Sequence, residues 1–216
     1  MKRRKKIVEN PRKTFLIVTS SEAELLYFSQ MRKDCRYTNM SVIWAEEARD
    51  LEEFIRIAAR ERIKGRFDKT WGLFSFDHFE LSSDQVREVL PYAKKRKIEL
   101  AWVNPGIGLW YLLHLQSPRA PVTDNGVIER SLQGVLPNFN LTPDYLLGDG
   151  DSLHLRLFPA KAQAVVNAGA YNTIFTQDYR GSLAPVNMTK LTTEIGDICG
   201  VADMTYNQKM IGLKNN

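Results

Sequence analysis

The chain has 216 residues, of which 44% are hydrophobic and 10% aromatic, and its formal net charge is +5. This length and composition suit one globular domain with a buried core and exclude an intrinsically disordered protein. Because no apolar run reaches the ~18 residues of a membrane span, no secretory signal is visible, and Cys35 and Cys199 lack metal-site spacing, we expect a cytoplasmic protein without membrane contact.

The positive charge is concentrated at the N-terminus. Residues 1–13 carry +6 and the remaining 203 residues carry −1 in total. A basic arm of this kind can bind the phosphates of a nucleic acid without sequence preference, or it can be a solubilising tail. The arm's basic residues are Lys2, Arg3, Arg4, Lys5, Lys6, Arg12 and Lys13.

Four short apolar runs predict β-strands, and each is followed by a segment with helical periodicity. The predicted strands are residues 13–21, 40–48, 70–77 and 98–105. The predicted helices are residues 21–35, 49–64, 82–97 and 106–116, with Ser21 and either Ser82 or Ser83 as N-caps. Strands that alternate with helices indicate an α/β fold with a mostly parallel sheet flanked by helices.

The sequence changes character after Gln116. Two stretches between residues 117 and 152 are rich in turn-forming residues, and helices are predicted again over residues 158–175 and 186–201. We therefore divide the chain into a basic arm (1–13), an α/β core (14–117) and a loop-rich, helical C-terminal extension of the same domain (118–216).

Polar residues follow three of the predicted strands, at residues 19–21, 77–80 and 104–108. In parallel sheets, ligands bind at the carboxyl ends of the strands, so these segments mark the expected site. Asp77 could hold Mg²⁺ there if a second carboxylate joined it, and Glu24 and Glu80 are the candidates. The alternative is that Asp77 only caps a turn.

Other polar residues carry weaker signals. His78 could act as an acid or base but is also typical of a solvated loop, and His114 on an apolar helix is typical of a buried, hydrogen-bonded histidine. His154 has no suggestive neighbours in the sequence. Four bases, Lys94, Lys95, Arg96 and Lys97, close a predicted helix and either offset its dipole or contact phosphate.

The segments "FLIVTSSEAELLYF", "DKTWGLFSFDHFE" and "IELAWVNPGIGLWYLLHLQ" together resemble the RloB-like family over residues 14–200. The resemblance implies a Toprim-like fold and an association with bacterial restriction and anti-phage defence loci. Its most specific part is "NPGIGLWYLLHL", in which Asn104, Pro105, Trp110 and His114 match the family motif.

The acidic motifs of that family are incomplete in this chain. Ser20 and Ser21 stand where the family has a Glu-Gly pair, and Glu24 matches the acid that ends that motif. Asp77 matches the first aspartate of the family's D-x-D-D, but Phe79 replaces the second, and Glu80 takes the third position. Gly108 replaces a further glutamate. Because phenylalanine cannot ligate a metal, the resemblance implies a degenerate metal site.

Three functions follow as hypotheses. The first is a catalytically degenerate Toprim-like subunit of an anti-phage defence system that binds a partner protein, of the ABC or OLD-like ATPase kind, or nucleic acid. The second is an active Mg²⁺-dependent nuclease that uses Glu24, Asp77 and Glu80. The third is a nucleic-acid-binding or sensing module without chemistry. We expect no cofactor, or Mg²⁺ held weakly by Asp77 and Glu80.

Overall fold

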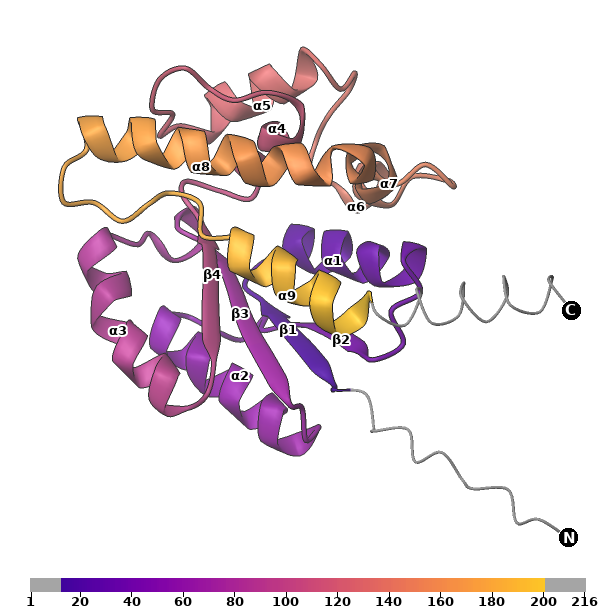
Figure 1. Ribbon diagram of the computed structural model, residues 1–216, viewed down its shortest axis with the longest axis vertical. Helices are drawn as coiled ribbons and strands as arrows, with labels where there is room; N and C mark the ends of the chain where they lie inside the picture. Colours follow the sequence, from indigo (N-terminus) through magenta and orange to yellow (C-terminus); the bar gives the residue numbers. More distant parts are fainter. Residues whose placement is uncertain (1–12, 201–216) are drawn as a thin grey trace, which may run out of the picture.

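The computed structural model describes residues 13–200, so the arm residues from Lys2 to Arg12 lie outside the described part. Strands and helices alternate through the first half, and helices make up the second half (Figure 1). The strands are β1 (Phe15–Thr19), β2 (Met40–Trp44), β3 (Lys69–Ser75) and β4 (Glu99–Val103). The helices are α1 (Glu22–Asp34), α2 (Leu51–Lys64), α3 (Ser83–Lys95), α4 (Gly108–Leu115), α5 (Asn125–Gln133), α6 (Pro143–Leu147), α7 (Leu153–Leu157), α8 (Lys161–Asp178) and α9 (Thr189–Cys199).

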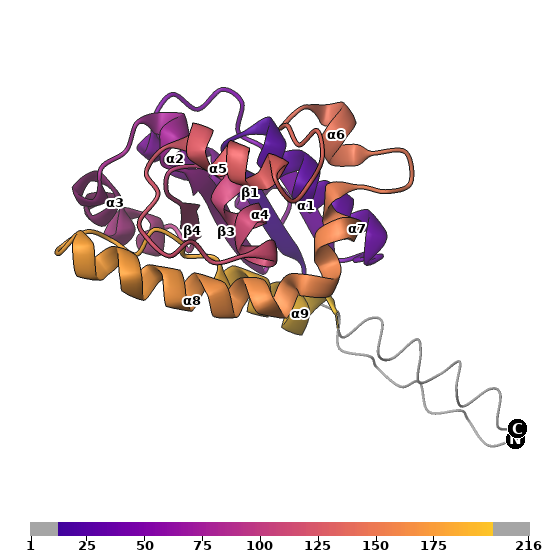
Figure 2. The same ribbon diagram turned by 90° about the horizontal axis from the view of Figure 1, so that it is seen from above.

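The four strands form one parallel sheet in the order β2-β1-β3-β4. Helices α2 and α3 cover one face, and α1 and α9 cover the other, with α4, α5 and α8 beyond the carboxyl ends of the strands (Figures 1 and 2). The α/β fold with a parallel, helix-flanked sheet and a C-terminal helical extension is therefore confirmed.

Successive side chains of each strand point to opposite faces of the sheet and pack into two separate hydrophobic cores. Phe15 and Ile17 of β1 point toward α1, α4 and α9, whereas Leu16 and Val18 point toward α2 and α3. All four are fully buried, as expected for strands whose two faces are both covered by helices. The first core also contains residues from α5 to α9, so the C-terminal extension is packed into the same core as β1.

Polar side chains fix the beginnings of the helices as the sequence predicted. Ser21 caps α1 and Ser82 caps α3, and each forms a reciprocal capping box with the third residue of its helix. Asp50 accepts a hydrogen bond from the backbone N–H of Glu53 at the start of α2. These caps satisfy backbone donors that a helix cannot pair internally.

Two details of the predicted elements were wrong. The third strand ends at Ser75, so Asp77 lies in a short 3-10 turn (Asp77–Phe79) rather than in the strand. The helices α5, α6 and α7 were not predicted, and α6 lies within a stretch that was predicted as turns. The last two span five residues each, which is too short for a clear helical period in the sequence.

The segment that joins α8 to α9 closes the outer edge of β4. The backbone N–H of Asn104 donates to the carbonyl of Pro185 (2.8 Å), and the N–H of Asn187 donates to the carbonyl of Trp102 (2.9 Å). Val103 and Val186 form an antiparallel bridge between these bonds. Over residues 13–200, no helix has the length and apolar character needed to cross a membrane.

Candidate functional site

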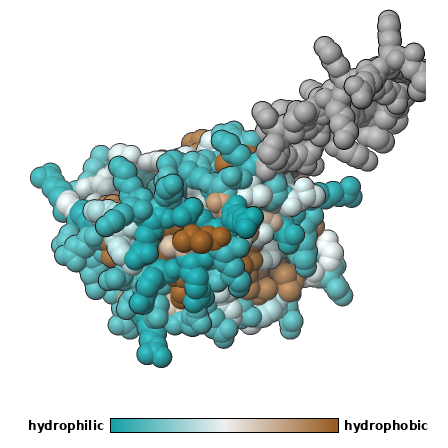
Figure 3. All heavy atoms as spheres, turned by 90° about the horizontal axis from the view of Figure 1, so that it is seen from below, coloured by the Kyte–Doolittle hydropathy of each residue, from teal (hydrophilic) through white to brown (hydrophobic). Residues whose placement is uncertain are grey.

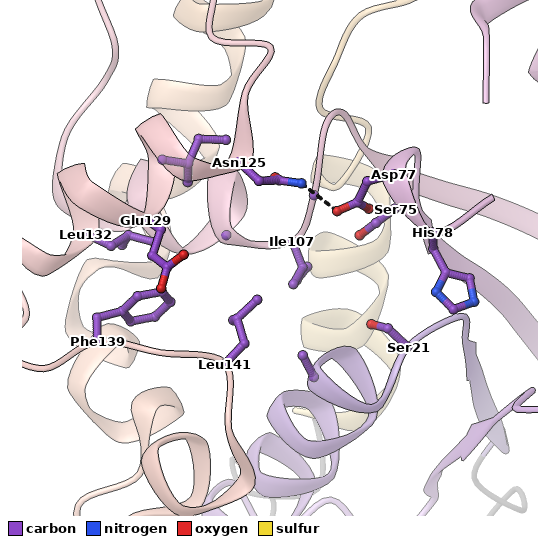
Figure 4. A pocket seen from close by; sticks show the side chains of 14 residues that line it. Ser21, Ser75, Asp77, His78, Ile107, Asn125, Glu129, Leu132, Phe139 and Leu141 are labelled. Carbon is purple, nitrogen blue, oxygen red and sulfur yellow. Dashed lines mark hydrogen bonds between the residues drawn. The ribbon is translucent and has the colours of Figure 1, made fainter. Parts of the chain in front are cut away.

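A cavity of about 330 Å³ opens at the carboxyl ends of the strands. Ser21, Ser75 and Asp77 form one side of it, and Glu129 of α5 and Phe139 face them across the space (Figure 4). The residues after β1, β3 and β4 meet here, which is the arrangement that a parallel sheet imposes.

Glu24 is fully buried, and its hydrogen-bond partners Ser21 and Ser75 line this cavity. Its Oε2 accepts hydrogen bonds from the N–H of Ser20 (2.9 Å), the hydroxyl of Ser20 (3.0 Å) and the N–H of Ser21 (3.1 Å). Its Oε1 accepts a hydrogen bond from the hydroxyl of Ser75 (2.7 Å). Both carboxyl oxygens are thus engaged by the protein itself, and they tie the end of β1 to the end of β3.

Burial raises the pKa of the Glu24 carboxyl to about 7, and the hydrogen bonds from Ser75, Ser21 and Ser20 oppose that rise. Desolvation therefore outweighs the four donors. This pKa lies well above the usual range of a glutamate.

Asp77 lies at the rim of the cavity, and its Oδ2 accepts a hydrogen bond from Nδ2 of Asn125 (2.7 Å; Figure 4). Burial raises the pKa of Asp77, and the Asn125 bond opposes the rise. Gly106 makes this contact possible, because a Cβ at that position would lie 2.7 Å from both Oδ2 of Asp77 and Oδ1 of Asn125.

Substitution of Gly106 by alanine is expected to force the Asp77–Asn125 pair apart and to lower the free energy of unfolding by about 1 kcal/mol, the size of one hydrogen bond. Urea denaturation measures this effect. In an Asn125→Ala background the same substitution is expected to cost clearly less, because the pair is already broken. Equal costs in both backgrounds would contradict this explanation.

The structure separates the three predicted acids. Glu24 is buried, Asp77 is at the rim, and Glu80 is exposed and does not line the cavity. Within residues 13–200, no three His, Cys, Asp or Glu side chains are grouped so that they could hold a metal ion. With the oxygens of Glu24 already bonded and Asp77 held by Asn125, the arrangement does not fit a shared Mg²⁺ site.

The neighbours of Asp77 have different environments. His78 is exposed, and desolvation lowers its pKa while the Asp77 charge opposes the shift. Phe79 is half-buried and packs against Phe54 of α2, with ring centroids 5.9 Å apart. The residue that replaces an aspartate of the family motif thus belongs to the second core.

The motif residues around α4 have mainly packing roles. Asn104 and Pro105 are joined by a cis peptide bond, and the carbonyl of Pro105 accepts a hydrogen bond from the N–H of Asp77 (3.0 Å). Trp110 is 2% exposed. His114 is buried, and its Nδ1–H donates to the carbonyl of Trp110 (2.9 Å), as expected for a hydrogen-bonded core histidine.

Three polar residues of the cavity were not found from the sequence: Ser75, Asn125 and Glu129. Ser75 is the last residue of β3, and its hydroxyl donates a hydrogen bond to Glu24. A polar residue at the carboxyl end of an apolar strand is a sequence signal that could have identified it. Asn125 and Glu129 lie in a helix that was not predicted, so no sequence signal placed them here.

Of the predicted basic residues that the structure describes, Lys94 and Lys97 lie near the amino ends of β3 and β4. Lys94 and Lys97 line a cavity of about 650 Å³ together with Lys69 and Lys190. Lys69 and Lys190 form ion pairs with Glu99, whereas Lys94 and Lys97 have no ion pair among residues 13–200. Arg96 stacks on the ring of Tyr92 (4.3 Å), Lys95 is exposed, and Lys13 is the one residue of the arm that the structure describes.

Comparison with protein-family models matches residues 15–197 to the family described as RloB-like protein. Neither the curated proteins nor the solved structures contain a match to this chain.

Proposed function

Because the chain belongs to the RloB-like protein family, we propose that it is a catalytically degenerate Toprim-like subunit of a bacterial anti-phage defence system, acting by binding rather than by cleavage. Its partners would be a protein of the ABC or OLD-like ATPase kind, nucleic acid, or both. It would act in the cytoplasm.

The single observation that carries this proposal is the environment of Glu24. In a working metal site, a carboxylate at this position would direct its oxygens toward an ion. Here both oxygens accept hydrogen bonds from Ser20, Ser21 and Ser75, two of which stand where the family has a Glu-Gly pair. This serine network supports the proposal, because it engages both oxygens of the Glu24 carboxyl within the fold.

Nuclease activity is the alternative, and a cleavage assay distinguishes the two. The purified chain is incubated with labelled single- and double-stranded DNA and RNA and with Mg²⁺ or Mn²⁺. We expect no cleavage above that of the Asp77→Ala variant. Metal-dependent cleavage by the wild-type chain that this variant loses would overturn the proposal in favour of the nuclease.

Nucleic-acid binding is favoured by the unpaired charges of Lys94 and Lys97. They line a cavity near the amino ends of β3 and β4, at the opposite end of the strands from Glu24. The face of the molecule seen from below is mostly hydrophilic, with apolar groups near its middle and toward its lower right (Figure 3). The cavity also contains Asp68, which is bonded to Thr14, and Glu99, which is paired with Lys69 and Lys190, so the ammonium groups of Lys94 and Lys97 are left to bind backbone phosphates.

The double variant Lys94→Gln, Lys97→Gln is expected to weaken duplex DNA binding and to reduce the slope of log K against log salt by about 2, because each phosphate contact contributes roughly 0.9. Fluorescence anisotropy between about 50 and about 200 mM salt measures the slope. Arg32→Gln with Lys33→Gln is the matched control, because it removes the same charge from the exposed end of α1. If the control lowers the slope equally, Lys94 and Lys97 do not form a specific site.

A further inference from the structure

The cavity lined by Lys94 and Lys97 is larger than a contact with a phosphate requires. Its volume is about 650 Å³, against about 330 Å³ for the cavity at the carboxyl ends of the strands. Sites for small organic ligands span about 300–1,000 Å³, so this cavity has room for a group of nucleotide size. A phosphate bound on a flat basic surface would need no such space.

Apolar side chains form one part of the lining. Leu90 of α3 is half-buried, and Ile98, Leu100 and Trp102 are 3–7% exposed. A planar ring that filled the space would remove this apolar surface from water, which favours binding.

Cations form another part of the lining, and they outnumber the acids. Four lysines line the cavity against two carboxylates, which leaves a net charge of +2; the lysines are Lys69, Lys94, Lys97 and Lys190, and the acids are Asp68 and Glu99. Glu99 pairs with Lys69 and Lys190, and Lys69 also pairs with Glu194, which does not line the cavity. Lys94 and Lys97 are both exposed, so their ammonium groups are accessible to an anion.

The turn between α3 and β4 places Lys94 and Lys97 together. The N–H of Lys97 donates to the carbonyl of Lys94 (3.0 Å), and the N–H of Ile98 donates to the carbonyl of Ala93 (3.0 Å). This pattern ends a helix with one residue in the left-handed region, and that residue is Lys97, whose φ is 62°. Because glycine is the usual residue at such a position, replacing Lys97 by glycine removes the charge without straining the backbone.

We propose that this cavity binds one unpaired nucleotide of a single-stranded nucleic acid. Its base would fill the apolar part, and the phosphates on either side of it would bind Lys94 and Lys97. The bases of a duplex are stacked and paired inside the helix, so a duplex could offer this cavity only its phosphates. The inference rests on the nucleic-acid binding proposed above for the same lysines and adds the form of nucleic acid that they bind.

A matched pair of probes separates the base from the phosphates. One probe is a single-stranded oligothymidylate, and the other is an abasic strand with the same number of phosphates. Fluorescence anisotropy with the full-length chain gives both affinities. We expect the abasic strand to bind about tenfold more weakly, toward the lower end of the contribution of one inserted base. Equal affinities would overturn the proposal.

A duplex as a third probe separates this inference from the function on which it rests. Binding of all three probes that depends on Lys94 and Lys97 but not on the bases would overturn base insertion and retain nucleic-acid binding. Absence of binding to all three probes would overturn both.

Two glycine substitutions locate the phosphates. Lys97→Gly is expected to reduce the slope of log K against log salt for the oligothymidylate by roughly 0.7, the value for one phosphate contact of a single strand. Arg36→Gly is the matched control, because Arg36 has a φ of 53° in the same kind of turn after α1, is exposed and does not line the cavity. Urea denaturation is expected to show that neither substitution lowers stability. An equal slope change in both variants, or none in Lys97→Gly, would overturn the assignment.

Leu90→Trp locates the base. It places a larger side chain at the apolar wall, so the two single strands are expected to bind this variant with equal affinity. A preference for the oligothymidylate that survives in Leu90→Trp would place the base elsewhere and overturn the assignment. If this variant fails to fold, backbone amide NMR signals of residues 93–100 in the wild-type chain decide the question. Signals that shift more with the oligothymidylate than with the abasic strand are expected, and identical shifts would contradict base insertion.

Discussion

Substitution of Trp110 by alanine is expected to lower the free energy of unfolding by about 3–5 kcal/mol, the usual cost of deleting a large buried aromatic side chain. Trp110 is among the largest fully or nearly fully buried side chains, and its ring packs edge-on against His114 with the centroids 5.0 Å apart. The hydrogen bond from His114 goes to the backbone carbonyl of Trp110 and survives the substitution. Urea denaturation followed by circular dichroism measures the loss.

Trp110→Phe is the matched control, because it retains an aromatic ring in the same place. We expect it to retain more than half of the stability that alanine loses. This pair tests whether the tryptophan of the family motif is kept for packing. If Trp110→Ala were nearly as stable as the wild type, packing of this side chain would not stabilise the core, and a role in binding would be the better explanation.

Glu24→Gln is expected to become more stable relative to the wild type as the pH rises. The folded-state pKa of about 7 lies above the unfolded value of 4.5. The wild-type carboxyl therefore contributes stability that is fully present below about pH 4.5 and is lost as the pH rises to about 7. Between about pH 5 and about pH 8, the stability difference should shift by roughly 2–3 kcal/mol in favour of the variant.

The comparison must use both proteins at each pH, because the buried histidines titrate in the opposite sense. The lowered pKa values of His114 and His154 make the folded state gain stability as the pH rises toward about 6.5. Glutamine can keep its carbonyl toward Ser20 and Ser21 and donate its N–H to the hydroxyl of Ser75. Glu22→Gln, at an exposed position in the same helical turn, is the control and should show no such pH-dependent difference. A flat difference curve for Glu24→Gln would rule out the raised pKa.

The α/β part of the fold could be predicted because its signals are local. Strand β1 is a continuous apolar run, as strands buried on both faces must be, and Ser21 and Ser82 mark the helix starts through their caps. The position of Asp77 at the carboxyl edge also followed from parallel topology. These features depend on a few neighbouring residues each, so a single sequence contains them.

The rest depends on contacts between residues far apart in the chain. Asn125 reaches Asp77 across 48 positions, and His154 reaches Asp34 across 120, and neither pair has any sequence pattern. Glu24 was recognised as an acid of the expected site, but its environment depends on Ser75, which is 51 residues away. The hydroxyls of Ser20 and Ser75, which follow β1 and end β3, hold the Glu24 carboxyl within the fold, and no local sequence pattern shows that they meet there.

The segment before α9 protects the carboxyl end of the β4 edge from pairing with strands of other chains. An open edge strand is a template for strands of other chains, and a sheet with two open edges can grow without limit into fibres. Here the backbone groups of Trp102 and Asn104 are already bonded to the segment before α9. The other edge strand of the sheet is β2, and a strand that joined the sheet at the carboxyl end of β4 would first have to displace this segment.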